Sequence, residues 1–132
     1  LVSLEMSEVV RDGFLPMLKP DGFILLNQQR LVPVGLNRDA YPSVDRVRAA
    51  LAAYRVVEFD ALAEARALGD PTGRTANVVA LGVLAAIAPF SKLPVAVWHR
   101  ALLDVSSSEL MKRSNIAAFD RGRRLLAETG AT

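Results

Sequence analysis

The feature that most constrains the fold is the apolar run from Ala76 to Ala88, which follows a turn-forming segment at residues 70–73. Asn77 is the one strongly polar residue in this run, so a helix formed here is apolar on all sides. Such a helix belongs in the interior of a domain. At about 1.5 Å per residue it is long enough to cross a small core and too short to span a bilayer. Gly82 lowers the helix propensity, which predicts a neighbouring backbone packed closely against it.

Composition narrows the class of protein. The chain has 132 residues, 52% of them hydrophobic, and it contains no cysteine. These values predict a single domain over residues 1–132 with a substantial core. Without cysteine the chain can form neither a disulfide nor a thiolate-held iron–sulfur cluster, and a single histidine, His99, argues against a zinc site. We therefore expect no metal site in this chain.

Charge and hydropathy bear on location and partners. No basic segment precedes an apolar one as in a signal peptide, and no uncharged apolar window is long enough for a membrane span. The basic residues are scattered apart from Arg121, Arg123 and Arg124, which form either a solvated helix face or an anion contact. We expect a cytoplasmic protein with no membrane and no nucleic acid as partner.

Short apolar runs alternate with helical patterns along the chain. A continuous apolar run bounded by turns is typical of a strand buried in a parallel sheet. The predicted strands are residues 1–4, 23–26 and 56–59, and helices are predicted to begin near residues 7, 43, 60, 76, 94 and 106. This alternation is typical of βαβ units. The sequence therefore predicts an α/β fold: a three-layer Rossmann-like domain with a mainly parallel sheet, the central buried helix and a helical C-terminal tail.

Local signals predict how several helices begin and which faces they bury. Ser43 and Asp60 have the residue types of helix N-caps, Ser7 is a further candidate, and Ser106 forms a capping-box pattern with Glu109. The apolar residues expected to face the core are Val9, Val10, Phe14, Leu15, Val44, Val47, Leu51, Tyr54, Leu62, Ala65, Leu68, Val95, Trp98, Leu102 and Val105.

Polar residues follow the first two predicted strands. Glu5 comes directly after the first strand, while Asn27 and Gln28 follow the second, with Arg30 close behind. Ligands of open parallel sheets bind at the carboxyl ends of the strands, where carboxamides can hydrogen-bond them and an arginine can hold a phosphate or carboxylate. Two alternatives stay open: Glu5 stabilises the next helix N-terminus, and residues 27–30 are a polar loop leading to an extended margin at residues 31–34.

The segment before the apolar run has two glycines, Gly69 and Gly73, ahead of a helix. Free N–H groups there can face a phosphate, although a plain turn explains the pattern equally well. Asn77 either fixes this loop or faces a cleft, and we favour the first role. The sequence contains no Walker-type loop, no GxGxxG motif and no complete set of catalytic side chains. We therefore expect no catalytic residue in this chain.

Several motifs follow one another in an order that is informative as a whole. They are Ser3-Leu4-Glu5, Leu18-Lys19-Pro20-Asp21-Gly22, the segment from Asn27 to Val34, Tyr41-Pro42, Gly69-Asp70-Pro71, the segment from Thr75 to Gly82, and Asn115-x-x-Ala118-Phe119-x-x-Gly122. In this order and spacing they resemble the gamma-type domain of 2-oxoacid:ferredoxin oxidoreductases, most closely the beta subunit of indolepyruvate ferredoxin oxidoreductase.

The resemblance implies a component of an enzyme that oxidatively decarboxylates a 2-oxoacid, such as the aryl pyruvate indolepyruvate, to an acyl-CoA and passes electrons to ferredoxin. It implies that thiamine diphosphate and iron–sulfur clusters are held by a catalytic alpha-type partner subunit. The chain would pack on that subunit and assist access of coenzyme A as co-substrate. The candidate cofactor-binding residues are then Glu5, Asn27, Gln28, Arg30 and Asn77, with Arg30 the best candidate for an anionic group of coenzyme A.

One part of the family's pattern has no counterpart here. The family's domain opens with a glycine-rich strand–turn–helix, so we expect residues 1–132 to be the C-terminal portion of such a domain. Two other functions stay open. One is a non-catalytic docking module whose apolar surface serves assembly, and the other is a stand-alone nucleotide-binding α/β protein that uses residues 69–74 to hold phosphate.

Overall fold

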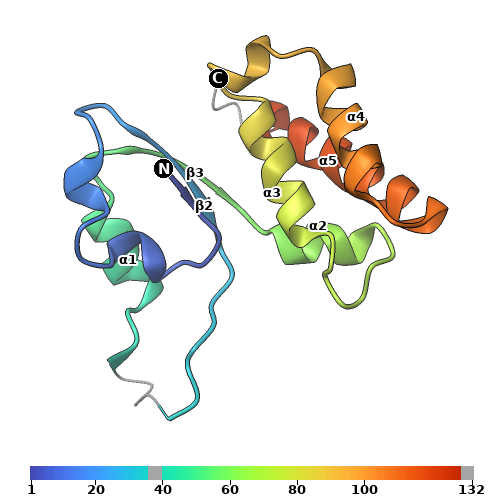
Figure 1. Ribbon diagram of the computed structural model, residues 1–132. Helices are drawn as coiled ribbons and strands as arrows, with labels where there is room; N and C mark the ends of the chain where they lie inside the picture. The colour runs from blue at the N-terminus through green and yellow to red at the C-terminus, as the bar shows by residue number, and fades with distance from the viewer. Residues whose placement is uncertain (36–39, 129–132) are drawn as a thin grey trace. The chain divides into compact units, whose positions relative to one another are not determined.

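The computed structural model describes residues 1–35 and 40–128, and the chain divides into two compact units, Leu1–Phe59 and Asp60–Thr132. The strands lie in the first unit and four of the described α-helices lie in the second (Figure 1). The prediction of a single domain over residues 1–132 stays a prediction, and each unit is described by itself.

Three strands of the described residues form a parallel sheet in the first unit, in the order β1 (Val2–Ser3), β2 (Phe23–Asn27) and β3 (Arg55–Phe59). β2 is central, because Leu25 is paired with Val2 on one side and with Val57 on the other. The apolar side chains of β2 suit a strand buried on both faces, as predicted for a parallel sheet.

One face of this sheet is covered by short helices. They are α1 (Val44–Ala50) and the 3-10 helices η1 (Glu8–Val10) and η2 (Leu15–Met17). Ser43 caps α1 as predicted, since its Oγ accepts a hydrogen bond from the Arg46 N–H at 3.2 Å. The buried cluster between these helices and the sheet consists of Met6, Val9, Ile24, Leu26, Val47 and Leu51, with Val10, Leu15, Val44 and Tyr54 packed against it.

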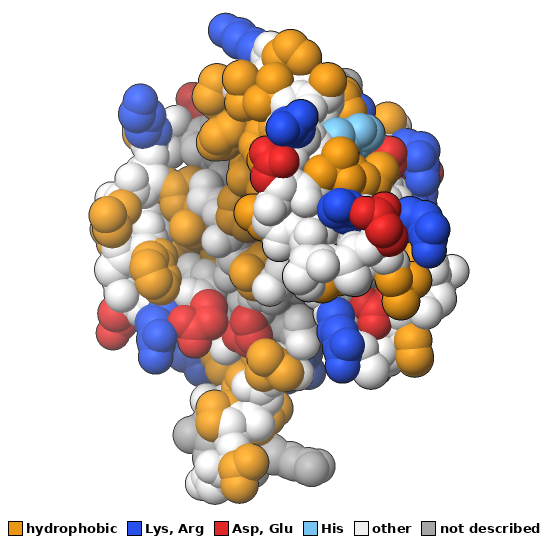
Figure 2. Space-filling view, turned by 45° about the vertical axis from the view of Figure 1, so that its right-hand side comes forward, with side chains coloured by type: hydrophobic (Ala, Val, Ile, Leu, Met, Phe, Trp, Pro, Cys, Tyr) orange, Lys and Arg blue, Asp and Glu red, His pale blue; other side chains and the backbone are white. Residues whose placement is uncertain are grey.

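Two expectations for the first unit are wrong. Residues 7–15 form short 3-10 turns instead of an α-helix capped by Ser7, because the backbone is extended at Arg11 and has φ at +97° at Gly13. Phe14 is 42% exposed and does not face the core as expected. Residues 31–34 form no strand and pair with none of the three strands of the sheet. Leu31, Val32 and Val34 are exposed instead, on the loop that extends downwards in Figure 2.

The described part of the second unit is helical. It contains α2 (Ala61–Ala67), α3 (Ala76–Ala85), the 3-10 helix η4 (Phe90–Lys92), α4 (Val95–Val105) and α5 (Glu109–Glu128). Asp60 caps α2 as predicted, because its Oδ1 accepts a hydrogen bond from the Ala63 N–H at 2.9 Å. Gly69 ends α2 with φ at +88°, a backbone conformation that favours glycine. Ala65 is buried and Leu62 is half-buried, but Leu68 is 43% exposed and does not face the core as expected.

The central apolar helix of the sequence is α3, which lies side by side with α5 (Figure 1). A Cβ added to Gly82 would lie 2.1 Å from the Phe119 carbonyl oxygen and 3.0 Å from the Gly122 Cα. A Cβ added to Gly122 would in turn lie 2.0 Å from the Val79 carbonyl oxygen. The predicted close approach of a second backbone at Gly82 is therefore confirmed, and its partner is α5.

The C-terminal helices bury an aromatic cluster. Trp98 on α4 stacks on Phe119 of α5 with ring centroids 5.8 Å apart, and Leu102 is buried beside them. Val105 is 76% exposed, so the inward stripe of α4 ends before it. The expected cap at Ser106 is also wrong: Ser108 caps α5 by accepting from the Met111 N–H, while the Ser106 hydroxyl donates to the Leu102 carbonyl at the end of α4.

The fold class is confirmed: the chain is a mixed α/β protein with a parallel sheet, consistent with a Rossmann-like fold. Within the part of the chain that the structure describes, no helix is long and apolar enough to cross a membrane.

Candidate functional site

The carboxyl edge of the sheet gathers three of the predicted site residues. Glu5 follows β1, Asn27 is the last residue of β2, and Gln28 comes directly after it. The strands are parallel, so their carboxyl ends meet at the same edge. Asn27 is buried, and its Nδ2 donates to the Leu4 carbonyl oxygen at 2.9 Å, which ties the end of β2 to the end of β1.

Glu5 accepts hydrogen bonds from three separate segments of the chain at this edge. One carboxylate oxygen accepts hydrogen bonds from the Ser7 N–H at 2.8 Å, the Ser7 hydroxyl at 2.6 Å and the Glu8 N–H at 3.1 Å. The other oxygen accepts from the Leu31 N–H at 3.1 Å and from the Tyr41 hydroxyl. The Glu5 side chain thus caps η1, as one of the two sequence interpretations proposed, and also joins two distant segments to it.

These contacts shift the pKa values of Glu5 and Tyr41. Burial raises the pKa of Glu5, but the hydrogen bonds from Ser7, Tyr41 and Leu31 together outweigh it and hold the pKa below its ordinary value. Burial, and then the hydrogen bond to the Glu5 carboxylate, raise the pKa of the Tyr41 hydroxyl. Glu5 is therefore an anion at neutral pH whose lone pairs point at donors of its own chain, and Tyr41 is a neutral donor.

Gln28 is exposed and belongs to a separate polar chain on the same edge. Its Nε2 donates to one carboxylate oxygen of Glu58 at 3.0 Å, and Arg48 binds both Glu58 oxygens at 2.7 Å and 2.8 Å. The hydrogen bonds from Arg48 hold the pKa of Glu58 below its ordinary range. This network orients the Gln28 carboxamide.

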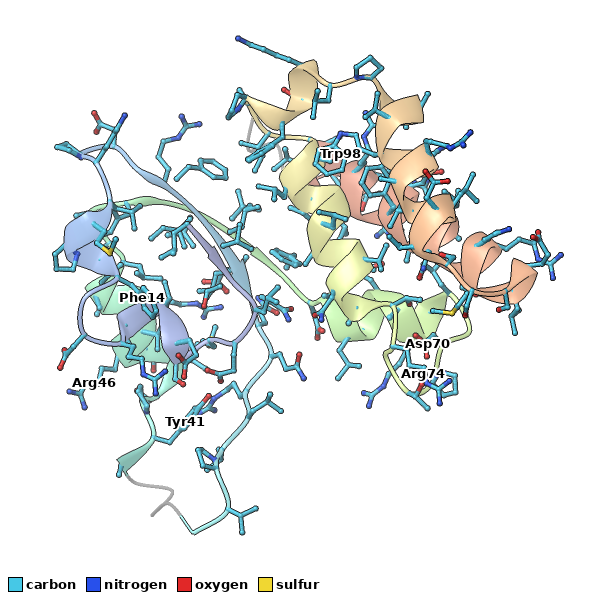
Figure 3. All side chains as sticks on the ribbon, in the orientation of Figure 1. Phe14, Tyr41, Arg46, Asp70, Arg74 and Trp98 are labelled. Atoms are coloured by element: carbon cyan, nitrogen blue, oxygen red, sulfur yellow. The ribbon has the colours of Figure 1, made fainter. Side chains whose placement is uncertain are left out.

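Arg30 is exposed and lies against Tyr41. Its guanidinium carbon is 5.0 Å from the centroid of the Tyr41 ring, and its Nη2 donates to the Pro42 carbonyl oxygen at 3.2 Å. Within the described residues no carboxylate forms an ion pair with Arg30, and its hydrogen bond is to the neutral Pro42 carbonyl oxygen. Tyr41 and Pro42 also line a cavity of about 450 Å³, together with Glu5 and Arg11. Figure 3 places Tyr41 in the loop before α1.

Asn77, the fifth predicted site residue, belongs to the second unit, where it is exposed in the first turn of α3. The loop before α3 is held by Asp70, whose Oδ2 accepts from the Thr75 N–H at 2.7 Å and from the Thr75 hydroxyl at 2.9 Å. The favoured role of Asn77 in fixing this loop is therefore wrong, because a carboxylate already performs it. A role for Asn77 in ligand binding stays a prediction.

The same contacts bear on the phosphate interpretation of residues 69–74. The donors of Thr72 and Thr75 point at the carboxylate of Asp70, which lies where a bound phosphate would have to accept them. Asp70 and Arg74 lie in this loop (Figure 3), beside a cavity of about 550 Å³ that the start of α5 also lines. A phosphate in the turn would face the negative charge of Asp70.

Sequence reasoning missed Tyr41 as part of the site. Tyr41 lies 36 positions from its partner Glu5, so no local pattern connects them. The one available signal was its place in the Tyr41-Pro42 motif beside an N-cap. Asp70 was identified only as a turn former, although its carboxylate is what closes the turn.

The residues present do not fit the cofactors that the resemblance implies for the whole enzyme. The chain has no cysteine and supplies no thiolate to an iron–sulfur cluster. Within residues 1–35 and 40–128, no three His, Cys, Asp or Glu side chains gather as a metal site built from the protein alone would require. The exposed Arg30 guanidinium could bind an anion at this edge, and ligand binding there stays a prediction.

Comparison with known proteins identifies the family. No curated protein and no solved structure matches the chain. Residues 1–125 match the family described as "POR: Pyruvate ferredoxin/flavodoxin oxidoreductase". This match runs through both compact units and covers nearly the whole sequence. The chain therefore belongs to the pyruvate ferredoxin/flavodoxin oxidoreductase family and is a component of a 2-oxoacid oxidoreductase.

Proposed function

We propose that this chain is the gamma-type component of an enzyme that oxidatively decarboxylates an aryl pyruvate such as indolepyruvate. In that reaction the bond between the carboxylate and the keto carbon breaks, carbon dioxide leaves, and the acyl group forms a thioester with coenzyme A. The released electron pair passes to ferredoxin. Thiamine diphosphate and the iron–sulfur clusters belong to the alpha-type partner subunit, on which this chain packs, and the chain assists access of coenzyme A.

The observation that supports the coenzyme A role is the exposed guanidinium of Arg30 at the carboxyl edge of the sheet, with which no carboxylate of residues 1–35 and 40–128 forms an ion pair. The guanidinium is exposed, is held over the Tyr41 ring, and makes its hydrogen bond to a neutral carbonyl oxygen. Such a group binds phosphate through two parallel N–H donors. Glu5 and Glu58, the acids of the same edge, are engaged by donors of their own chain and compete little for Arg30.

The test is the coenzyme A dependence of the assembled enzyme carrying Arg30→Ala. Because a hydrogen bond to a charged group contributes about 1.5–3 kcal/mol, the KM for coenzyme A should rise by roughly tenfold or more, while kcat changes little. Arg55→Ala is the matched control. Arg55 is also exposed and lies over an aromatic ring, 5.4 Å from the Phe23 centroid, but at the amino ends of the strands. An unchanged KM for coenzyme A in the Arg30→Ala enzyme would show that Arg30 does not bind coenzyme A.

The choice of an aryl pyruvate rests on the motif resemblance alone and needs its own test. The assembled enzyme should reduce ferredoxin fastest, by kcat/KM, with indolepyruvate among a panel that includes pyruvate and an aliphatic 2-oxoacid. Higher kcat/KM with pyruvate would reassign the substrate and leave the role of Arg30 untouched.

The second candidate is a docking module without a part in turnover. The exposed apolar residues Leu31, Val32 and Val34 favour it, because such side chains are typical of surfaces that a partner covers. The two functions differ in one measurement. For a docking module, Arg30→Ala and Leu31→Ser would change the amount of complex formed, whereas for the proposed function Arg30→Ala changes the KM of a fully formed complex.

A further inference from the structure

Three segments that are distant in sequence meet at one carboxylate. Glu5 accepts hydrogen bonds from Ser7 and Glu8 beside it, from the Leu31 N–H and from the Tyr41 hydroxyl. The last two donors flank the segment that carries Arg30, since Leu31 follows it in sequence and Tyr41 lies under its guanidinium. The position of the Arg30 charge is thus determined from both sides by groups that bind Glu5.

We infer that Glu5 and Tyr41 are positioning residues that hold Arg30 ready for the anionic group of coenzyme A, and that Glu5 itself does not contact the ligand. This inference rests on the proposed function and assigns the roles within it. It replaces the expectation that Glu5 binds a cofactor directly, because its two oxygens already accept five hydrogen bonds from the chain.

The physical basis is preorganisation. A free arginine side chain loses about 2 kcal/mol of rotamer entropy when a ligand orders it. The Tyr41 ring provides a surface on which the guanidinium lies before the ligand arrives, and the hydroxyl fixes that ring by donating to Glu5. The Pro42 carbonyl oxygen accepts from Nη2 and restricts the guanidinium further. Part of the ordering cost is therefore met in the free protein, which raises affinity without a new contact.

The same arrangement explains how an acid can stand close to an anion site. A bare carboxylate near Arg30 would pair with it and repel the ligand. Glu5 instead directs its charge toward backbone N–H groups and two hydroxyls, which stabilise it locally. Tyr41 lies between Glu5 and Arg30: its hydroxyl donates to Glu5, and its ring face is turned toward the Arg30 guanidinium.

The experiment uses the assembled enzyme and a double-mutant cycle. Tyr41→Phe keeps the ring and removes the hydrogen bond to Glu5. Glu5→Gln removes the negative charge to which the Tyr41 hydroxyl and the Leu31 N–H donate. Each should raise the KM for coenzyme A, and its Kd measured by calorimetry without 2-oxoacid, by roughly three- to tenfold with kcat unchanged. In the Arg30→Ala background neither substitution should raise these constants further, because they act through Arg30. In the Arg55→Ala background the full effect should persist.

The outcomes separate the inference from the proposed function. If Arg30→Ala raises the KM while Tyr41→Phe does not, the positioning role is wrong and the coenzyme A role stands. If Tyr41→Phe acts equally with and without Arg30, it acts independently and the inference is overturned. If Arg30→Ala has no effect, the coenzyme A role of Arg30 is wrong and the positioning role is refuted with it. Tyr41→Phe decides the matter should Glu5→Gln fail to assemble.

Discussion

Replacing Gly82 by alanine should destabilise the protein, although alanine is the better helix former. Gly82 lies in the middle of α3, where α5 crosses its backbone. The added Cβ would lie 2.1 Å from the Phe119 carbonyl oxygen. Unlike a flexible side chain, a helical carbonyl cannot turn aside, so the two helices have to separate.

The loss in free energy of unfolding can be estimated from the distance by which the two helices separate. Ordinary contact between heavy atoms begins near 3.5 Å, so the helices must part by roughly 1 Å, which forfeits about a quarter to a half of the attraction across the gap. A buried side chain such as Val79 or Phe119 makes on the order of 50 contacts of about 0.1 kcal/mol, or roughly 5 kcal/mol in all. About half of these contacts cross the gap between the helices, so each side chain loses roughly 1 kcal/mol and three such side chains lose about 3 kcal/mol. Replacing glycine by alanine in a helix returns about 1 kcal/mol. The net loss is about 2 kcal/mol.

Thermal unfolding followed by far-UV circular dichroism measures this change. A loss of about 2 kcal/mol lowers Tm by roughly 6 to 12 °C for a chain of this size. Asn77→Ala is the control in the same helix, because Asn77 is exposed and the substitution gains only helix propensity, about 0.5 kcal/mol. A rise in Tm for Gly82→Ala similar to that of the control would refute the close approach of the two backbones.

Two further predictions concern the second unit. The backbone hydrogen bond from Thr75, with those of the threonine hydroxyls, holds the pKa of Asp70 below its ordinary value of 3.8, so its stabilisation is complete at neutral pH and is lost as the pH falls below about 4. Asp70→Asn should therefore be less stable at pH 7 and lose less stability between about pH 5 and 3, and urea unfolding showing an unchanged pH slope would contradict this. Arg121 binds Glu64 with two half-buried hydrogen bonds of 2.6 Å and 3.2 Å, so Arg121→Ala should cost roughly 1–2 kcal/mol in urea unfolding. Lys112→Ala, which breaks an exposed pair, should cost less than about 0.5 kcal/mol, and equal effects would refute the difference.

Elements governed by neighbouring residues could be predicted from the sequence. Ser43 and Asp60 begin their helices because an N-cap oxygen needs only the N–H groups that follow it within three residues. The cap of α5 was expected at Ser106 and lies at Ser108, whose hydroxyl accepts from the Met111 N–H. The α-helix expected after Ser7 does not form, because the chain leaves the helical conformation at Arg11 and has a positive φ at Gly13.

In the candidate site, too, the positions of the residues could be predicted from local sequence, whereas their hydrogen-bond partners could not. That Glu5, Asn27 and Gln28 lie at the carboxyl edge followed from their place after apolar runs, since parallel strands bring such residues to one edge. Their partners did not follow. Nothing in the sequence connects Glu5 with Tyr41, or Gln28 with Glu58, which lies 30 positions away. The sequence could therefore locate the edge and could not say which side chains are left to meet a ligand.

By itself, the sequence determined the class of fold, the parallel strands, the apolar helix that begins at Ala76 and the need for a second backbone beside Gly82. These properties depend on periodicity and on the conformational limits of single residues, which act over a few positions. The helix ends at Ala85, before the end of the apolar run at Ala88. Only the tertiary structure decided that the second backbone is that of α5 at Gly122, that Glu5 accepts a hydrogen bond from Tyr41, and that Arg30 lies over the Tyr41 ring. Such pairings depend on which distant segments the folded chain brings into contact, and a local pattern carries no information about its partner.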